Sequence, residues 1–254
     1  MEVADLSPDV AKVPKNFRAL LFGASEAGKS HWIGSLIRNK DKVFPAPGYA
    51  KFIYCSPNLG ESALSSNRDL EYQKNLREWA APSEIIFLNN IITEEELFEQ
   101  AEAANGPTLL IIDDYSQELF ATDLVYKLFT RLSSHGTGKS TVVSVHQTLG
   151  SKTPGKWNSL IFSNSNFFVI FRNIANKAAI GELSKRIFPY GKNFLQRCLN
   201  QATHICGSYA YIVVDASLQN PLNHRFGVRT RVFQEGGEPV ILFKNPDIYC
   251  RGNQ

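Results

Sequence analysis

Short apolar runs alternate with amphipathic stretches along most of this chain, a pattern typical of α/β proteins. The longer stretches include a helix predicted at 94–104, where Thr93 and Glu96 form a capping box and residues 105–107 (Asn-Gly-Pro) end the helix. The apolar runs predict strands at Arg18–Phe22, Lys51–Cys55, Glu84–Leu88, Thr108–Ile112, Thr141–His146 and Phe167–Arg172. We therefore expect a mostly parallel central sheet with helices on its faces.

The two ends of the chain differ from this pattern. Residues 1–16 are polar and contain two prolines, so they are expected to form a flexible lead-in to a single domain spanning 17–254. From about residue 208, strand-like segments follow one another closely and are joined by turn-rich sequence, which predicts an antiparallel extension of the sheet. These segments are Tyr209–Val214, Val228–Phe233 and Val240–Phe243.

A glycine-rich segment with the form G-x-x-x-x-G-K-[ST] lies between the first predicted strand and a helix-like stretch. In this context its backbone N–H groups are expected to surround the phosphates of a nucleoside triphosphate, aided by the helix N-terminus. Lys29 is expected to reach the β- and γ-phosphates, and the Ser30 hydroxyl to bind Mg²⁺. The predicted nucleotide-binding residues are Gly23, Ala24, Ser25, Glu26, Ala27, Gly28, Lys29 and Ser30.

Two carboxylates end the apolar strand at 108–112. A carboxylate at the carboxyl end of a central strand lies beside the phosphate loop, where it can hold Mg²⁺, often through water. Asp113 fits this role, and Asp114 is then placed to act as the general base that activates the attacking water. The segment predicts hydrolysis of ATP with Mg²⁺ as cofactor.

The strand at 141–146 ends in His146 and Gln147, at the same predicted edge of the sheet. A glutamine there can contact the γ-phosphate or the attacking water and report hydrolysis to the rest of the domain. His146 is interpreted as structural, because Asp113 and Asp114 already provide the metal ligand and the base.

Charge is unevenly distributed, although the net charge is only +3. Residues 82–123 hold ten acidic residues and no lysine or arginine, whereas residues 138–200 hold nine basic residues and one acid. This asymmetry suggests a basic face suited to a polyanion, although two ordinary solvated faces would have the same composition. Basic candidates for contacts with nucleic acid are Lys152, Lys156, Lys185, Arg186 and Lys192.

The four cysteines form no metal-ligand or disulfide spacing, and no apolar run reaches the ~20 residues that span a bilayer. The start of the sequence resembles neither a signal peptide nor a transit peptide. We expect a soluble intracellular protein without a membrane partner.

Together these segments resemble the viral genome-packaging ATPases of the FtsK–HerA superfamily, in the branch shared by poxviruses and Maverick/polinton-type elements. The resemblance covers about residues 17–235 and follows the order of the phosphate loop, the strand ending in two aspartates and the strand ending in Gln147. It continues through Asn166–Asn173, Leu183–Pro189, Tyr211–Asp215 and Arg225–Arg231. The fold it implies is a P-loop NTPase (RecA/ASCE-like).

The resemblance implies a ring-forming, homo-oligomeric translocase of DNA, most simply double-stranded, that packages viral or virus-like DNA into capsids. A capsid or portal-vertex protein is the implied partner, and the implied location is the cytoplasm or nucleus of an infected host cell, or the virion. In such proteins a neighbouring subunit usually completes the nucleotide site with an arginine. Arg131 is the first candidate for this role and Arg172 the second.

Two other enzyme classes remain open from the sequence. A P-loop helicase would share the phosphate loop and both aspartates, and a P-loop kinase acting on a nucleotide or metabolite would share the phosphate loop. A kinase transfers phosphate to an acceptor hydroxyl and needs no water-activating acid, so Asp114 and Gln147 favour hydrolysis.

Overall fold

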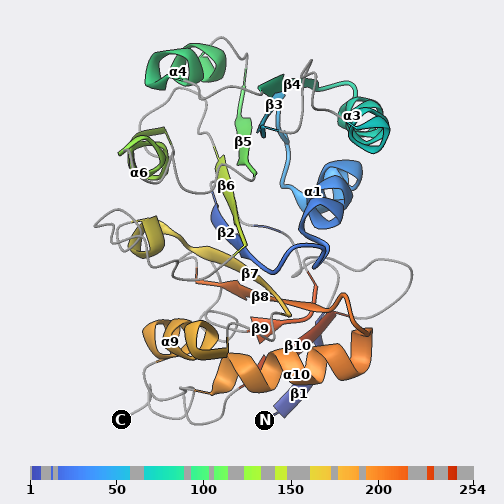
Figure 1. Cartoon of the computed structure of the whole chain (residues 1–254), viewed down its shortest axis with the longest axis vertical. Helices are drawn as coiled ribbons and strands as arrows, with labels where there is room; N and C mark the ends of the chain where they lie inside the picture. Colours follow the sequence, from blue (N-terminus) through green and yellow to red (C-terminus); the bar gives the residue numbers. More distant parts are fainter. Residues whose placement is uncertain are drawn as a thin grey trace.

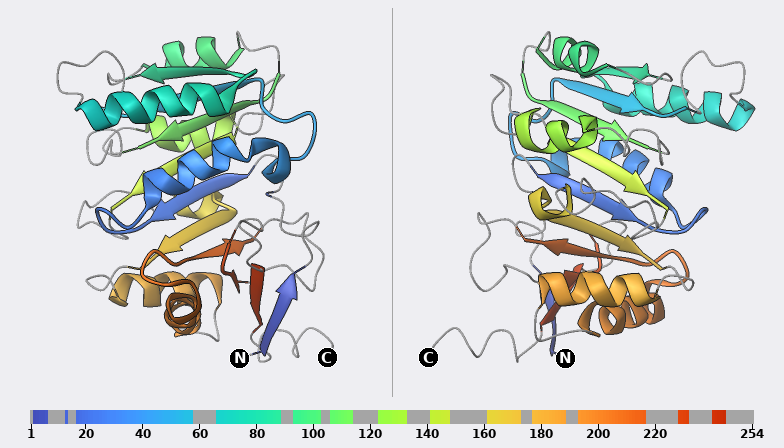
Figure 2. Two further views of the ribbon diagram at one scale, coloured as in Figure 1. Left: turned by 90° about the vertical axis from the view of Figure 1, so that its right-hand side faces the viewer. Right: turned by 60° about the vertical axis from the view of Figure 1, so that its left-hand side comes forward.

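The computed structural model of the chain describes residues 2–6, 13, 17–57, 66–88, 93–102, 106–113, 123–132, 141–147, 161–172, 177–188, 193–216, 228–231 and 240–244. Within these residues, the strands form one sheet in the order β1-β10-β9-β8-β7-β2-β6-β5-β3-β4 (Figure 1). The sheet twists along the long axis of the molecule, and helices cover both of its faces (Figure 2).

The parallel part of the sheet consists of the strands predicted from the apolar runs. It contains β2 (Arg18–Phe22), β3 (Lys51–Cys55), β4 (Glu84–Leu88), β5 (Thr108–Ile112), β6 (Thr141–His146) and β7 (Phe167–Phe171). Strand β2 pairs with β6 and β7, and β5 pairs with β6 and β3. Strand β6 thus separates the strand that leads into the phosphate loop from the strand that ends at Asp113. This order agrees with the RecA/ASCE-like arrangement, and the predicted fold class is confirmed.

The direction of the strands reverses at β7. Strand β8 (Tyr211–Asp215) pairs antiparallel with β7, and β9 (Val228–Arg229) and β10 (Val240–Lys244) continue the antiparallel part. The predicted C-terminal extension is therefore present, although β8 begins two residues later than expected. The reason is a turn before it, in which the N–H of Ala210 donates to the carbonyl of Gly207 at 3.1 Å.

The N-terminal residues provide a correction. The sequence predicted an irregular lead-in over 1–16, but Glu2–Leu6 form strand β1, which pairs antiparallel with all five residues of β10. By pairing with β10, β1 satisfies backbone groups that β10 would otherwise expose at the edge of the sheet. Of the remaining lead-in residues, Val13 is buried and its N–H donates to the carbonyl of Val43 at 3.1 Å.

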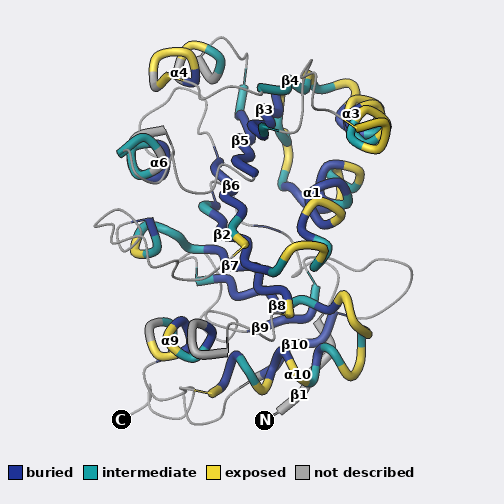
Figure 3. Tube along the Cα trace, viewed as in Figure 1, coloured by how far each residue is buried: buried dark blue, intermediate teal, exposed yellow. Residues whose placement is uncertain are grey.

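Alternate residues of the central strands face two separate helical layers, as the twofold periodicity of a strand requires. Ala19 and Leu21 pack with α1 (Lys29–Arg38) and α3 (Asn67–Ala80), while Leu20 and Phe22 face the other layer. That layer contains α4 (Glu94–Glu102), η2 (Leu128–Leu132), α9 (Lys177–Ile187) and α10 (Phe194–Cys206). Burial is therefore concentrated in the strands between these layers (Figure 3).

Three short helical segments are also described: α2 (Lys40–Val43), α6 (Leu124–Lys127) and residues 161–164. The helix predicted at 94–104 is α4, and both hydrogen bonds of its capping box are present: the Thr93 N–H donates to Glu96, and the Glu96 N–H donates to Thr93 Oγ1. Among the described residues, no helix is long and apolar enough to cross a bilayer.

Candidate nucleotide site

The glycine-rich segment forms the connection between β2 and α1 at the carboxyl edge of the parallel strands. Its first residue is fixed to the neighbouring strand, because the Gly23 N–H donates to the carbonyl of His146 at 3.1 Å. Glu26 and Gly28 both have left-handed backbones, with φ of 61° and 99°. Such conformations turn successive N–H groups inward and create an anion-binding concavity.

The two glycines of the motif are required for different reasons. A Cβ atom added to Gly23 would lie 2.7 Å from Cβ of Phe171 and 3.2 Å from Cβ of Ala27, closer than carbon atoms pack. At Gly28 the space is adequate, but φ of 99° is unfavourable for residues with a side chain. The motif therefore reflects a close approach of β7 to the loop as well as the turn itself.

Lys29 is buried, and its ammonium is held against the loop. Nζ donates to the carbonyls of Gly23 at 2.8 Å and Ala24 at 2.7 Å. These contacts place the charge inside the concavity where the sequence predicted contact with phosphates. The N-terminus of α1 adds its partial positive charge to that of Lys29. No acidic residue in the first turn of α1 offsets this charge.

Ser30 is exposed in the first turn of α1, and its carbonyl accepts a hydrogen bond from the Tyr72 hydroxyl at 2.7 Å. Tyr72 belongs to α3, which approaches α1 closely at Gly34. A Cβ atom on Gly34 would lie 3.1 Å from Trp79 of α3 and 3.4 Å from Tyr72. The hydrogen bond from Tyr72 fixes the first turn of α1, and with it the position of the predicted Mg²⁺ ligand Ser30.

Asp113 follows β5 directly and is buried. Its N–H donates to the carbonyl of Cys55 at 2.8 Å, and its Oδ2 accepts a hydrogen bond from the Tyr54 hydroxyl at 2.7 Å. Burial, together with the nearby charge of Asp113, raises the pKa of Tyr54 well above its usual value, so the hydroxyl remains a donor. The second aspartate, Asp114, lies outside the described residues.

Strand β6, which lies between β2 and β5, also ends at the carboxyl edge of the parallel strands. His146 contacts the ring of Phe22 with ring centroids 5.4 Å apart, and its Nε2 lies 3.1 Å from the Ser144 hydroxyl. Although the side chain keeps some exposure, burial of the ring lowers the pKa of His146 to about 4. A neutral, packed histidine agrees with the structural role expected for it. Gln147, the predicted sensor, is exposed immediately beyond it.

The two candidate arginines lie at opposite ends of the parallel strands, Arg131 near the amino ends and Arg172 at the carboxyl ends. Arg131 is part of η2, which lies beside the start of β2, since Arg18 Nη1 donates to the carbonyl of Phe129 at 3.5 Å. The phosphate loop begins at the other end of β2, roughly 13 Å away by the rise of a strand. Arg172 is exposed and directly follows Phe171, the residue that crowds Gly23.

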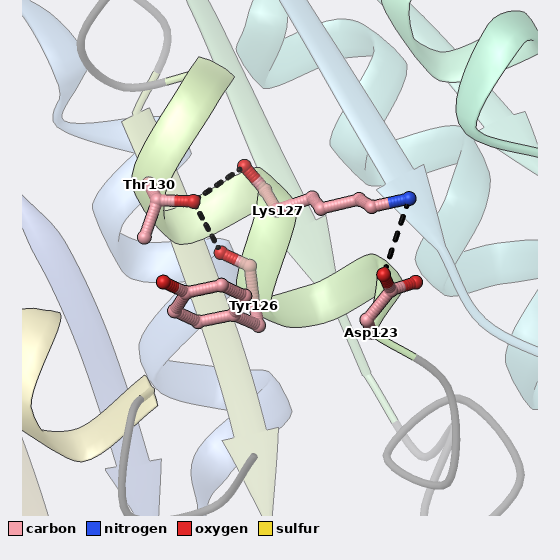
Figure 4. Close-up of polar contacts among 4 residues, drawn as sticks. All are labelled: Asp123, Tyr126, Lys127 and Thr130. Carbon is pink, nitrogen blue, oxygen red and sulfur yellow. Dashed lines mark hydrogen bonds and ion pairs between the residues drawn. The ribbon is translucent and has the colours of Figure 1, made fainter.

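The backbone around η2 is held by hydrogen bonds within its own helix (Figure 4). Thr130 Oγ1 donates to the carbonyls of Tyr126 at 2.9 Å and Lys127 at 3.4 Å, and Lys127 forms an ion pair with Asp123 at 3.2 Å. These contacts fix the segment that carries Arg131, although the side chain of Arg131 itself is not among those described.

The predicted basic face is described only in part. Lys185 is exposed on α9 and forms an ion pair with Glu182, with Nζ and Oε1 2.6 Å apart. Arg186 lies on the same helix, but its side chain is not described. Lys152, Lys156 and Lys192 lie outside the described residues.

Four aromatic residues near the site were not predicted from the sequence. Tyr54 contacts the Asp113 carboxylate, and Tyr72 contacts the start of α1. Phe171 and Tyr209 lie beside the loop glycines. Their positions depend on pairing between distant strands and helices, which no local pattern reveals. A hydroxyl inside the buried strand 51–55 was the one available signal, since a buried Tyr O–H requires a partner.

The sheet order and the loop between β2 and α1 define a P-loop NTPase fold. No protein-family model matches the sequence, and no curated protein is significantly similar to it. Among solved structures, the chain is similar to the genome packaging NTPase B204 from Sulfolobus turreted icosahedral virus 2, determined in complex with ATP-gammaS. The identity is 13% and the TM-score 0.49, over 82% of this chain and 96% of that chain. This similarity is too distant to assign a family or a function.

Proposed function

We propose that this chain is an ATPase that couples ATP hydrolysis to the movement of double-stranded DNA into a capsid. The observation that carries the proposal is the arrangement at one sheet edge. There the phosphate loop, with Lys29 held against it, lies two strands away from the buried carboxylate of Asp113. The assignment to DNA and to packaging depends on the resemblance of the sequence segments.

In this proposal each residue has one task. The loop N–H groups bind the phosphates, and Lys29 contacts the β- and γ-phosphates. Ser30 and Asp113 offer a hydroxyl and a carboxylate oxygen, a donor set that fits Mg²⁺, which takes oxygen ligands and retains water. The metal neutralises charge on the phosphates when bound. Asp114 accepts a proton from the attacking water, and Gln147 orients that water or the γ-phosphate.

The direct test is release of inorganic phosphate from ATP, measured with and without duplex DNA. Lys29→Ala should abolish the activity, because the charge on the transferred phosphoryl group loses its main side-chain partner. Lys40→Ala is a matched control, since Lys40 donates to the carbonyls of Trp79 and Ala81 at the end of α3. Duplex DNA should raise the wild-type rate.

Each alternative has its own signature in this assay. Phosphate transferred to an added nucleotide or metabolite, with little release to water, would indicate a kinase. Stimulation by single-stranded DNA alone would favour a helicase. An ATPase rate that no DNA changes would contradict the translocase proposal while leaving the nucleotide site intact.

Binding to DNA is the second element of the proposal. Contacts between basic side chains and phosphates release counterions, so affinity should fall steeply with salt and depend little on sequence. Lys185→Ala should reduce the salt dependence only slightly, because Glu182 already lies 2.6 Å from its ammonium. Binding of a duplex across a salt series measures this, and a flat dependence would count against the basic face.

The third element is completion of the site by an arginine from a neighbouring subunit. Arg131 is the better candidate, because η2 lies beside the start of β2, whereas the loop follows its end. The backbone of η2 thus lies away from the loop of its own chain, and for this reason we assign Arg131 to the site of a neighbouring subunit. Arg172 lies at the loop edge and is the candidate for action within one chain.

Mixing variants separates these possibilities. Arg131→Ala and Lys29→Ala should each be inactive, and their mixture should recover activity, since a mixed interface pairs an intact loop with an intact arginine. Specific activity should also rise with protein concentration as subunits assemble. Absence of rescue, with Arg172→Ala inactive at every concentration, would place the arginine in the same chain.

A further inference from the structure

Tyr209 is the most exposed large apolar side chain among the described residues, with 72% of its surface accessible. It nevertheless lies against the phosphate loop. A Cβ atom placed on Gly28 would be 3.8 Å from Cδ1 of Tyr209 and 3.7 Å from Cε1 of Phe171. An exposed aromatic ring beside an anion-binding loop requires an explanation, since it contributes nothing to the core.

The reversal of strand direction brings this residue to the site. Because β8 is antiparallel to β7, with Tyr211 opposite Phe171, the turn that precedes β8 lies where β7 ends. Strand β7 is parallel to β2, so this is also where the loop begins. Tyr209 therefore reaches the carboxyl edge of the parallel strands from the antiparallel part of the sheet.

The turn that carries Tyr209 is fixed on both sides. Gly207 ends α10 with φ of 84°, and its N–H donates to the carbonyl of Thr203 at 3.0 Å. On the other side Ala210 is buried, and Tyr211 packs on Phe171 with ring centroids 5.3 Å apart. The turn is thus anchored while the ring of Tyr209 remains accessible, and an anchored ring loses little conformational freedom when it binds a ligand.

We propose that the ring of Tyr209 stacks on the nucleobase of the bound nucleotide. This inference rests on the proposed nucleotide site and assigns the part of the ligand that the loop does not hold. The loop fixes the phosphates, so the base must lie beyond them, outside the concavity. A flat aromatic face beside Gly28 offers stacking without hydrogen bonds that would select one base, so ATP and GTP should bind with similar affinity.

A second exposed apolar side chain, Ile205, precedes this turn near the end of α10 and is 46% exposed. Two of the three exposed large apolar side chains of the described residues are therefore close together in the sequence. The third, Leu70, is 52% exposed on α3 and provides a control for loss of an exposed apolar group.

The test compares ATP with inorganic tripolyphosphate, which carries phosphates but no base. Binding of both should be measured calorimetrically for wild type, Tyr209→Ala, Tyr209→Phe and Leu70→Ala. Loss of one stacking partner corresponds to a roughly 5- to 150-fold weaker affinity for ATP in Tyr209→Ala. Tyr209→Phe retains the ring and should remain within about twofold of wild type, as should Leu70→Ala. Tripolyphosphate should bind all four proteins equally.

Three results would overturn the inference. Wild-type ATP affinity in Tyr209→Ala would show that the ring does not contact the nucleotide. A parallel loss of tripolyphosphate binding would show that Tyr209 supports the loop instead of the base. Unchanged ATP binding with a loss of DNA binding or self-association would assign the ring to a macromolecular contact. If wild type bound neither ligand, the proposed nucleotide site itself would be wrong.

Discussion

Tyr54→Phe tests whether the aromatic layer beneath the site positions the metal carboxylate. The substitution removes one hydroxyl and keeps the ring, so packing in the buried strand β3 is preserved. It deletes the 2.7 Å hydrogen bond to Oδ2 of Asp113, and both partners are buried. Because burial raises the pKa of Tyr54, its hydroxyl is protonated at assay pH and the bond is present throughout.

The magnitude follows from the nature of the acceptor. A hydrogen bond to a charged group contributes about 1.5–3 kcal/mol, so the free energy of unfolding should fall by that amount. For a domain of this size the midpoint of thermal unfolding should fall by roughly 3–12 °C. Residues that orient a metal ligand typically change metal affinity by about 10- to 100-fold, so Mg²⁺ should be required at correspondingly higher concentration.

The assay combines thermal unfolding with a Mg²⁺ titration of ATPase activity. Tyr49→Phe is the matched control, because its hydroxyl donates to Thr141 Oγ1 at 2.6 Å, at the start of β6 and away from the loop. It should lower stability by about 0.5–1.5 kcal/mol and leave the Mg²⁺ requirement unchanged. If Tyr54→Phe lowered stability but kept the wild-type Mg²⁺ dependence, the hydrogen bond would be structural and the reasoning about Asp113 would fail.

Three further predictions concern the loop and its neighbours. Asp114→Asn should retain ATP and Mg²⁺ but turn over roughly 10²-fold more slowly, and a wild-type single-turnover rate would reject it as the base. Gly23→Ala should cost about 1–3 kcal/mol and weaken ATP binding, because its Cβ would meet Cβ of Phe171 at 2.7 Å; Phe171→Ala keeps that Cβ and should not rescue it. Burial lowers the pKa of His146 to about 4, below the unfolded value of about 6.5. The stability that depends on the neutral ring is therefore fully present above pH 6.5 and is lost as the pH falls towards 4. Denaturant unfolding across this range should show wild type losing on the order of 2 kcal/mol more than His146→Gln, and equal losses would contradict burial of the ring.

The sequence was sufficient for elements whose signals are local. Buried parallel strands appear as continuous apolar runs, so β2, β3, β5 and β6 begin and end where they were predicted. Strand β4, which is only partly buried at the edge of the sheet, also has its predicted bounds. The loop between β2 and α1 was also predictable as an element, because its glycines and lysine follow one another along the chain. In both cases the residues that determine the structure are sequence neighbours.

Features that depend on pairing between distant segments were not predictable. Strand β1 has no strong pattern of its own, and its partner β10 lies more than 230 residues later. The donor to Asp113 comes from β3, and the ring beside Gly28 comes from the turn before β8. Each contact follows from the strand order, which is decided by the whole sheet and not by any segment.

The opposite placement of the two arginines has a consequence for assembly. If Arg131 completes the site, the amino edge of the parallel strands in one subunit must face the carboxyl edge in the next. A twofold dimer brings identical surfaces together and cannot satisfy this requirement through one contact, whereas a head-to-tail contact does so and closes into a ring when its rotation permits. If Arg172 acts instead, the site needs no neighbour and assembly is free of this constraint. Because η2 lies beside the start of β2, a catalytic role for Arg131 would constrain the symmetry of an oligomer. Rescue by mixing Arg131→Ala with Lys29→Ala would then report both the arginine and the head-to-tail contact.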